Sequence, residues 1–116
     1  MNSSAKSGLL LTDAMKTYNV RVKRTAETDI DMLADFLFNT LSPGGAYRYL
    51  EIIGQEIQSL AVFADCFTTS HSKTIQAIHQ GSRRMVSHNC KFVYVFHIEG
   101  SLVMLDRVLF SKMVVD

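Results

Sequence analysis

The feature that most constrains the fold of this chain is a strand that is apolar on both faces. It spans residues 92–98. Alternation along an extended chain divides its side chains between the faces, with Phe92, Tyr94, Phe96 and Ile98 on one and Val93, Val95 and His97 on the other. Such a strand belongs at the centre of a sheet that is at least partly covered on both sides. A second apolar strand, 102–109, follows Glu99-Gly100, so we expect a tight hairpin there.

A short basic strand precedes this hairpin. It runs from Gly81 to Met85 and contains Arg83 and Arg84. Because adjacent residues of a strand point to opposite faces, only one of the two arginines can line a given surface. Cationic groups held by a rigid sheet suit contacts with phosphates or with an acidic partner segment.

One strand and one amphipathic helix are predicted near the start of the chain. Tyr18, Val20 and Val22 alternate with polar residues, which indicates a half-buried strand. Thr25 is expected to cap the helix that follows, with acidic residues in its first turn, where the helix dipole favours them. The apolar stripe of that helix comprises Ala26, Ile30, Leu33, Leu37 and Leu41.

The clearest break in the chain is Ser42-Pro43-Gly44-Gly45, which contains the only proline. A second helix is expected from about Ala46 to Phe63. Two helices joined by so short a turn must be antiparallel neighbours, forming an αα-hairpin. The apolar stripe of the second helix comprises Ala46, Leu50, Ile53, Ile57 and Leu60.

Residues 64–80 have no clear periodicity, and we expect at most one helical turn at 73–80. The predicted order is therefore β-α-α-β-β-β. The helical hairpin needs a sheet face on which to bury its stripes. We predict an α+β domain in which the helical hairpin packs on one face of a small, mainly antiparallel sheet.

The length and the charge pattern bound the remaining possibilities. The chain has 116 residues, which favours one domain. No apolar stretch approaches the ~20 residues that span a bilayer, so we expect a cytoplasmic protein with no membrane contact.

The net charge is +4 over residues 1–24, −6 over 25–65 and +3 over 66–116. Such segregation either steers an anionic partner or reflects solvated faces. Cys66 and Cys90 lack a CxxC spacing, and we expect buried or idle thiols.

The ordered set of motifs resembles the RelE/ParE superfamily of bacterial toxin–antitoxin toxins, also known as plasmid-stabilisation toxins. The resemblance covers about residues 16–110. The motifs that carry it are Tyr18 to Val22 with Ala26 to Ile30, then Ser42 and Ala46 with Tyr49 to Leu60, then Gly81 to Met85, Phe92 to Phe96 and Asp106 to Leu109. The resemblance implies a toxin domain at 16–116 and an N-terminal extension at 1–15.

Two activities occur in that superfamily. RelE-type members cleave mRNA on the ribosome, and ParE-type members inhibit DNA gyrase. Metal-free RNA cleavage needs an acid–base group and cations for the phosphate. The candidates are Arg83, Arg84 and Lys91 as cations and His88 or His97 as acid–base groups; His88 is the better placed but is equally explained as a loop residue.

The end of the chain departs from the family pattern and favours the ParE-like reading. Members commonly finish in a segment that contains histidine and arginine, whereas this chain has Phe110, Lys112 and Met113 there. A phenyl ring cannot transfer a proton. We therefore expect a ParE-like toxin that binds and inhibits a target such as gyrase and is not an enzyme. The alternatives are a RelE-type endoribonuclease and a decayed homologue that retains only protein binding.

The remaining candidate residues concern partners. Target or phosphate binding is assigned to Arg83, Arg84, Arg107 and Lys112. Arg84 and Arg107 are equally explained by ion pairs with helix carboxylates. The resemblance implies a cognate antitoxin, for which Met32, Phe36 and Tyr49 offer an apolar surface. The same residues are equally explained by a homodimer contact or as ordinary apolar residues of the surface. We expect neither a cofactor nor a metal.

Overall fold

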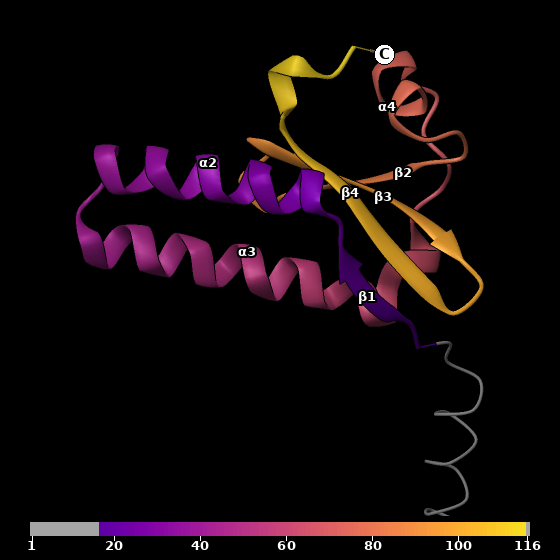
Figure 1. The fold of residues 1–116 in the computed structure, drawn as a ribbon, viewed down its shortest axis with the longest axis horizontal. Coiled ribbons are helices and arrows are strands. Elements are labelled where there is room, and N and C mark those ends of the chain that lie inside the picture. Colours follow the sequence, from indigo (N-terminus) through magenta and orange to yellow (C-terminus); the bar gives the residue numbers. More distant parts are fainter. Residues whose placement is uncertain (1–16, 116) are drawn as a thin grey trace, which may run out of the picture.

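The computed structural model describes residues 17–115, so the predicted extension at 1–15 lies outside the described part. The elements follow the chain in this order (Figure 1): β1 (Asn19–Val22), α2 (Arg24–Thr40), α3 (Pro43–Phe63), η1 (Ala64–Cys66), α4 (Lys73–Ile78), β2 (Arg83–Val86), β3 (Phe92–Glu99), β4 (Leu102–Phe110) and η2 (Ser111–Met113). The predicted β-α-α-β-β-β order is confirmed, with one short helix, α4, added before β2.

The four strands form one sheet in the order β1-β4-β3-β2. β2 and β4 both pair antiparallel with β3, and β1 joins the far edge parallel to β4. The sheet is therefore mixed but mainly antiparallel, as predicted, and β3 has a neighbour on each side. The hairpin turn lies at Gly100-Ser101, one residue later than expected, because Glu99 still pairs with Leu102. Gly100 has a φ of +61°, a conformation that favours glycine.

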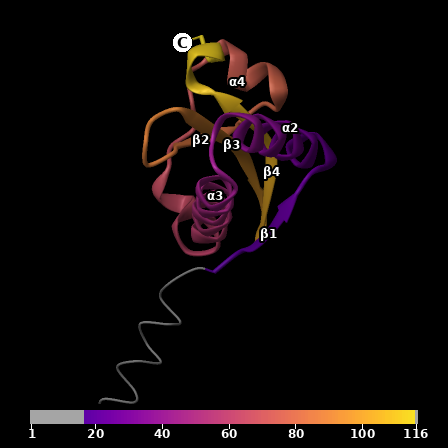
Figure 2. The ribbon, with the colours of Figure 1, turned by 90° about the vertical axis from the view of Figure 1, so that its left-hand side faces the viewer.

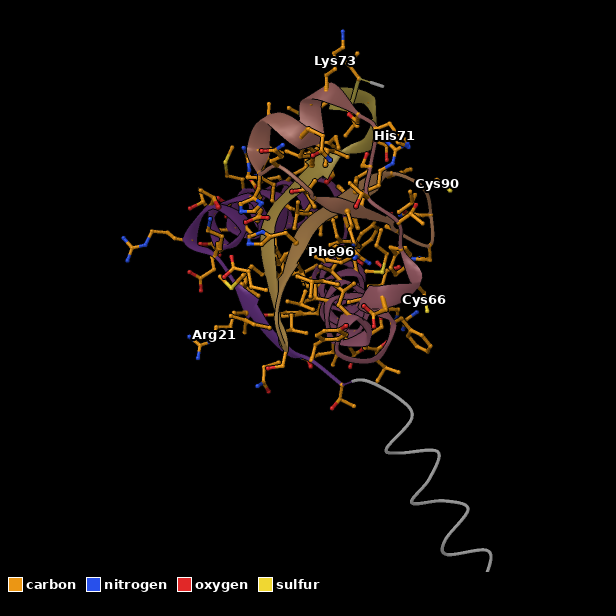
Figure 3. All side chains as sticks on the ribbon, turned by 90° about the vertical axis from the view of Figure 1, so that its right-hand side faces the viewer. Arg21, Cys66, His71, Lys73, Cys90 and Phe96 are labelled. Carbon is orange, nitrogen blue, oxygen red and sulfur yellow. The ribbon has the colours of Figure 1, made fainter. Side chains whose placement is uncertain are left out.

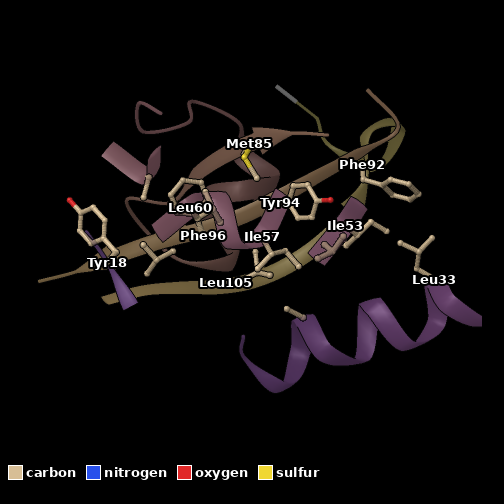
Figure 4. Close-up of a cluster of buried hydrophobic side chains, with 14 of the residues drawn as sticks. Tyr18, Leu33, Ile53, Ile57, Leu60, Met85, Phe92, Tyr94, Phe96 and Leu105 are labelled. Carbon is tan, nitrogen blue, oxygen red and sulfur yellow. The ribbon is translucent and has the colours of Figure 1, made fainter. Parts of the chain in front are cut away.

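The helical hairpin covers one face of the sheet (Figure 2), and its turn end projects beyond the strands (Figure 1). Ser42 caps α3 by accepting the backbone N–H of Gly45, and Pro43 occupies the first turn, where its missing N–H costs nothing. The stripes of α2 and α3 meet the apolar face of β3 and β4. Figure 4 shows this core, in which the buried side chains include Leu33, Ile53, Ile57, Leu60, Tyr94, Phe96 and Leu105.

A second, smaller core lies on the opposite face. Ile75 of α4 is fully buried there against Val93, Val95 and Leu109. Ser72 caps α4 by accepting the N–H of Ile75, and the backbone of Val115 bonds to Ser72 and Thr74. β3 is thus covered on both sides, as the double-faced apolar pattern predicted.

Three local expectations are wrong. Thr25 does not cap α2, because the helix begins at Arg24 and the Thr25 hydroxyl instead donates to the carbonyl of Asp106 at 2.7 Å. Leu41 is 42 % exposed, because α2 ends at Thr40 and Leu41 turns away from the stripe. Cys66 and Cys90 are free thiols, and both are exposed, so the buried alternative is wrong, while the idle alternative stays a prediction.

Candidate functional site

The two arginines of β2 point to opposite faces of the sheet, as predicted. Arg83 lies opposite Phe96 and Arg84 lies opposite Val95, which belong to the two different cores. Arg83 is half-buried, and its Nη1 donates to the carbonyl of Phe67 at 2.8 Å. That bond commits one N–H of Arg83 to holding the loop after η1, which leaves the rest of the guanidinium for a ligand.

Arg84 lines a hollow beside β2 whose walls are a mixture of polar and apolar side chains. The hollow has a volume of about 710 Å³ and lies between β2 and the loop 66–72. Its lining includes Val86 and His71, and Figure 3 shows Cys66 and His71 along the same side of the molecule. It is larger than the hollow of about 330 Å³ that Lys112 lines and than the groove of about 310 Å³ that Phe36 and Tyr49 line.

His88 and Lys91 lie in the loop between β2 and β3. The ring Nδ1 of His88 is 3.3 Å from Oε2 of Glu56, and the backbone N–H of His88 donates to the same oxygen at 2.7 Å. The other oxygen of Glu56 accepts the hydroxyl of Tyr94 at 2.6 Å. Burial, together with this bond, raises the pKa of Tyr94 far above its usual value. Glu56, a residue of α3, thus holds both His88 and Tyr94.

Arg83, His88 and Lys91, the main catalytic candidates, do not converge on one point. Arg83 is the first residue of β2, whereas His88 and Lys91 follow its other end. At about 3.3 Å per residue, the backbones of Arg83 and His88 are at most ~16 Å apart, and the extended part of β2 alone spans ~10 Å. A scissile phosphate would need a cation and an acid–base group within contact distance at once, which this arrangement does not offer without movement of the loop.

Arg107 and Lys112 have different surroundings. The guanidinium of Arg107 binds both oxygens of Asp29 on α2, with Nε donating at 2.7 Å and Nη2 at 3.0 Å. This bond to Asp29 raises the pKa of Arg107, and the pair is the structural alternative foreseen for this residue. Lys112 is exposed in η2, with its ammonium 5.9 Å from the ring centroid of Phe110.

The second concave surface is apolar and lies beneath the projecting end of the helical hairpin. It is a groove of about 310 Å³, lined by Phe36, Leu37, Thr40, Leu41, Tyr49, Lys91, Phe92 and Phe110. The Phe36 ring meets that of Phe110 edge-on at 6.3 Å, and the Tyr49 ring meets that of Phe92 at 5.9 Å. Two of the three residues predicted to contact an antitoxin thus share this groove.

Met32 and Phe110 lie differently from what the sequence predicts. Met32 is 66 % exposed on α2 and is not part of the groove lining. The sequence pattern singles out Phe110 only because it stands where the family commonly has histidine, yet Phe110 forms one wall of the groove. Its apolar character together with its pairing opposite Phe92 in the hairpin was the signal that could have indicated this role.

A buried polar network on the face opposite the helical hairpin was not anticipated as a unit. Nδ1 of His97 is 2.6 Å from Oδ2 of Asp106, and Nε2 is 2.6 Å from Oε2 of Glu99. The ring of His79 stacks on that of His97 with centroids 3.6 Å apart. A β-bulge in β4, between the pairs Val95–Arg107 and Phe96–Leu105, makes Asp106 the extra residue. Bulges redirect side chains in this way, and no sequence signal located this one.

No helix in the stretch 17–115 combines the length and apolar character that crossing a membrane requires.

No protein-family model matches the sequence, and no curated protein matches it. Among solved structures, the chain is similar to one described as the chromosomal ParDE TA system from P. aeruginosa. The TM-score is 0.68 at 18 % sequence identity, over 81 % of this chain and 96 % of that chain. This likeness confirms the predicted ParE-like α+β fold.

Proposed function

We propose that this protein is the toxin of a toxin–antitoxin pair, neutralised by a cognate antitoxin, and that it inhibits growth by binding a protein target such as DNA gyrase. The fold likeness to a ParDE system supports the general class. The apolar groove beneath the helical hairpin is the observation that carries the proposal furthest, because it offers a binding surface for a partner segment.

The groove has the character of a peptide-binding surface. Its lining is mostly aromatic and aliphatic, and Phe36 on its rim is 51 % exposed. Phe36, Tyr49 and Phe110 form one contiguous apolar surface, and burying a side chain of the size of Phe36 contributes roughly 1.5–3 kcal/mol. An amphipathic helix or extended segment of the antitoxin would lay its apolar residues against Phe36, Tyr49 and Phe110.

The surroundings of the basic residues favour binding over RNA cleavage. His88 is engaged with Glu56, and Arg107 is engaged with Asp29. Phe110, where histidine is common in the superfamily, lies in the groove and supplies no proton. The arginines of β2 and Lys112 are better suited to contact an acidic surface of a protein target.

Induced expression in a bacterium tests the activity. Gyrase inhibition predicts filamentation and a DNA-damage response while bulk mRNA is preserved. Rapid mRNA loss on induction would instead establish the endoribonuclease alternative. Unimpaired growth with a stable product would indicate a decayed homologue and would overturn the proposal.

A matched pair of variants tests the groove. Phe36→Glu places a charge in the groove, whereas Phe63→Glu places one on a side chain that is 52 % exposed at the far end of α3. The bait is the small protein encoded next to this one. We expect Phe36→Glu to weaken its capture in a co-expression pull-down at least tenfold, and Phe63→Glu to leave it unchanged. Equal capture by both variants would remove the groove as the antitoxin site.

A further inference from the structure

We propose that His79, His97 and Glu99 form a binding site for a divalent transition metal, with Zn²⁺ the ion that the donor set favours. Two imidazoles and one carboxylate are a common zinc ligand set. One donor atom from each residue lies within 4.8 Å of the other two. His97 and Glu99 are two residues apart on β3 and so share a face, and His79 directly follows α4. The site is separate from the groove of the proposed function.

His97 is the fixed anchor of this cluster. It is 4 % exposed, and Asp106, which holds its Nδ1 at 2.6 Å, is 2 % exposed. A carboxylate bonded to one ring nitrogen orients the other nitrogen and makes it a better ligand, an arrangement usual around zinc-binding histidines. Here the other nitrogen, Nε2, is directed at Glu99.

His79 is also held in the tautomer that a metal ligand needs. Its Nδ1 is 2.8 Å from the carbonyl oxygen of Gln80. Because a carbonyl only accepts hydrogen bonds, Nδ1 must carry the proton, which leaves the lone pair on Nε2. At His79, as at His97, an oxygen atom bonded to Nδ1 orients the ring, and at His79 that oxygen belongs to a backbone carbonyl.

Two of the three ligands must move to close around an ion. The rings of His79 and His97 are parallel to within 2°, so their lone pairs do not yet meet at one point. His79 is exposed and Glu99 is 61 % exposed beside the hairpin turn, so both side chains can turn. Ligands at about 2.1 Å from a tetrahedral ion are roughly 3.4 Å apart, so the 2.6 Å contact between His97 and Glu99 must open slightly.

The ion would bridge His97 and Glu99. Nε2 of His97 and Oε2 of Glu99 already lie 2.6 Å apart, while Nδ1 of His97 faces Asp106. A cation held by Nε2 and Glu99 would balance the charge of the carboxylates on either side of the ring. The bound ion would then tie the segment after α4 to the β3–β4 hairpin.

Titration of the purified full-length protein with ZnCl₂ tests the site. We expect saturable binding of one ion per chain by calorimetry and a rise in the melting temperature. His79→Ala and Glu99→Gln, which change exposed side chains, should each weaken Zn²⁺ affinity at least tenfold. The matched control is His71→Ala, since His71 is an exposed histidine outside the cluster, and its affinity should equal that of the wild type.

Three outcomes would contradict the proposal of a metal site. Wild-type protein that shows no saturable Zn²⁺ binding would overturn the proposal. So would Zn²⁺ affinities of His79→Ala and Glu99→Gln that equal that of the wild type, with circular dichroism showing all variants folded. A loss of affinity in His71→Ala as large as in His79→Ala would indicate adventitious binding by surface histidines and would also overturn it.

Discussion

At the scale of single residues, the carboxylate of Glu56 joins a helix, a strand and a loop. It accepts the Tyr94 hydroxyl from β3 with one oxygen and the His88 backbone N–H with the other. Each bond to a charged acceptor contributes about 1.5–3 kcal/mol in a partly buried setting. Glu56 thereby fixes the position of the β2–β3 loop relative to α3, and this loop carries Lys91 to the edge of the groove.

Tyr94 makes the stability of the fold sensitive to pH in the alkaline range. Burial raises its pKa first of all, and the bond to Glu56 adds to the effect. In the unfolded chain, where neither effect acts, the Tyr94 hydroxyl loses its proton from about pH 10. The folded chain keeps that proton to higher pH. The unfolded state then binds fewer protons, so the free energy of unfolding falls as the pH rises above 10, by up to about 1.4 kcal/mol per pH unit.

We expect Tyr94→Phe to lose about 1–2 kcal/mol of stability at neutral pH and to show a shallower decline above pH 10 than the wild type. Denaturant titrations between pH 8 and 11 measure both effects. Some decline should persist, because the hydroxyl of Tyr18 bonds to Asp65 and its pKa is also raised. Tyr47→Phe, which removes an exposed hydroxyl, is the control. Identical slopes for wild type and Tyr94→Phe would contradict this account.

At the scale of elements, α4 is held by tertiary contacts rather than by its own helix propensity. A helix of six residues is far shorter than the length at which helices are stable alone. Ile75 is fully buried against Val93, Val95 and Leu109 and is its main attachment. The Ser72 cap and the backbone bonds of Val115 add to it.

Truncation of Ile75 should therefore detach α4. We expect Ile75→Ala to cost about 2–4 kcal/mol and to increase amide hydrogen exchange throughout Lys73–Ile78. Ile78→Ala, which shortens a half-buried side chain of the same helix, should cost about 1 kcal/mol. Equal losses in the two variants would mean that the second core does not hold the helix.

The elements that the sequence predicted are those with a repeated pattern. The stripes of α2 and α3 and the double-faced alternation of β3 each rest on four or more residues, so single exceptions such as Leu41 did not obscure them. α4 rests on one buried isoleucine, which no periodicity reveals. The Asp106 bulge depends on strand pairing across the hairpin, and the Arg107–Asp29 pair joins residues 78 positions apart. Such contacts are fixed by tertiary structure and not by local pattern.

At the scale of the whole molecule, the two proposed binding sites lie on different faces of the sheet. The groove includes Phe92, at the start of β3 and on the side of the helical hairpin. The metal cluster includes His97 on the same strand but on the face that α4 covers in part. Five residues of a strand span about 16 Å, which exceeds the ~7–10 Å beyond which energetic effects usually add.

Independence of the two sites gives the last prediction. A ligand at 100 times its dissociation constant stabilises the folded state by about 2.7 kcal/mol. Zn²⁺ and the antitoxin segment, each at that excess, should together raise the free energy of unfolding by the sum of their separate effects, within about 0.5 kcal/mol. Denaturant titrations with neither, either and both ligands measure this. A shortfall of 1 kcal/mol or more would mean that the rigid β3–β4 hairpin couples the two faces, so that metal binding would regulate antitoxin capture.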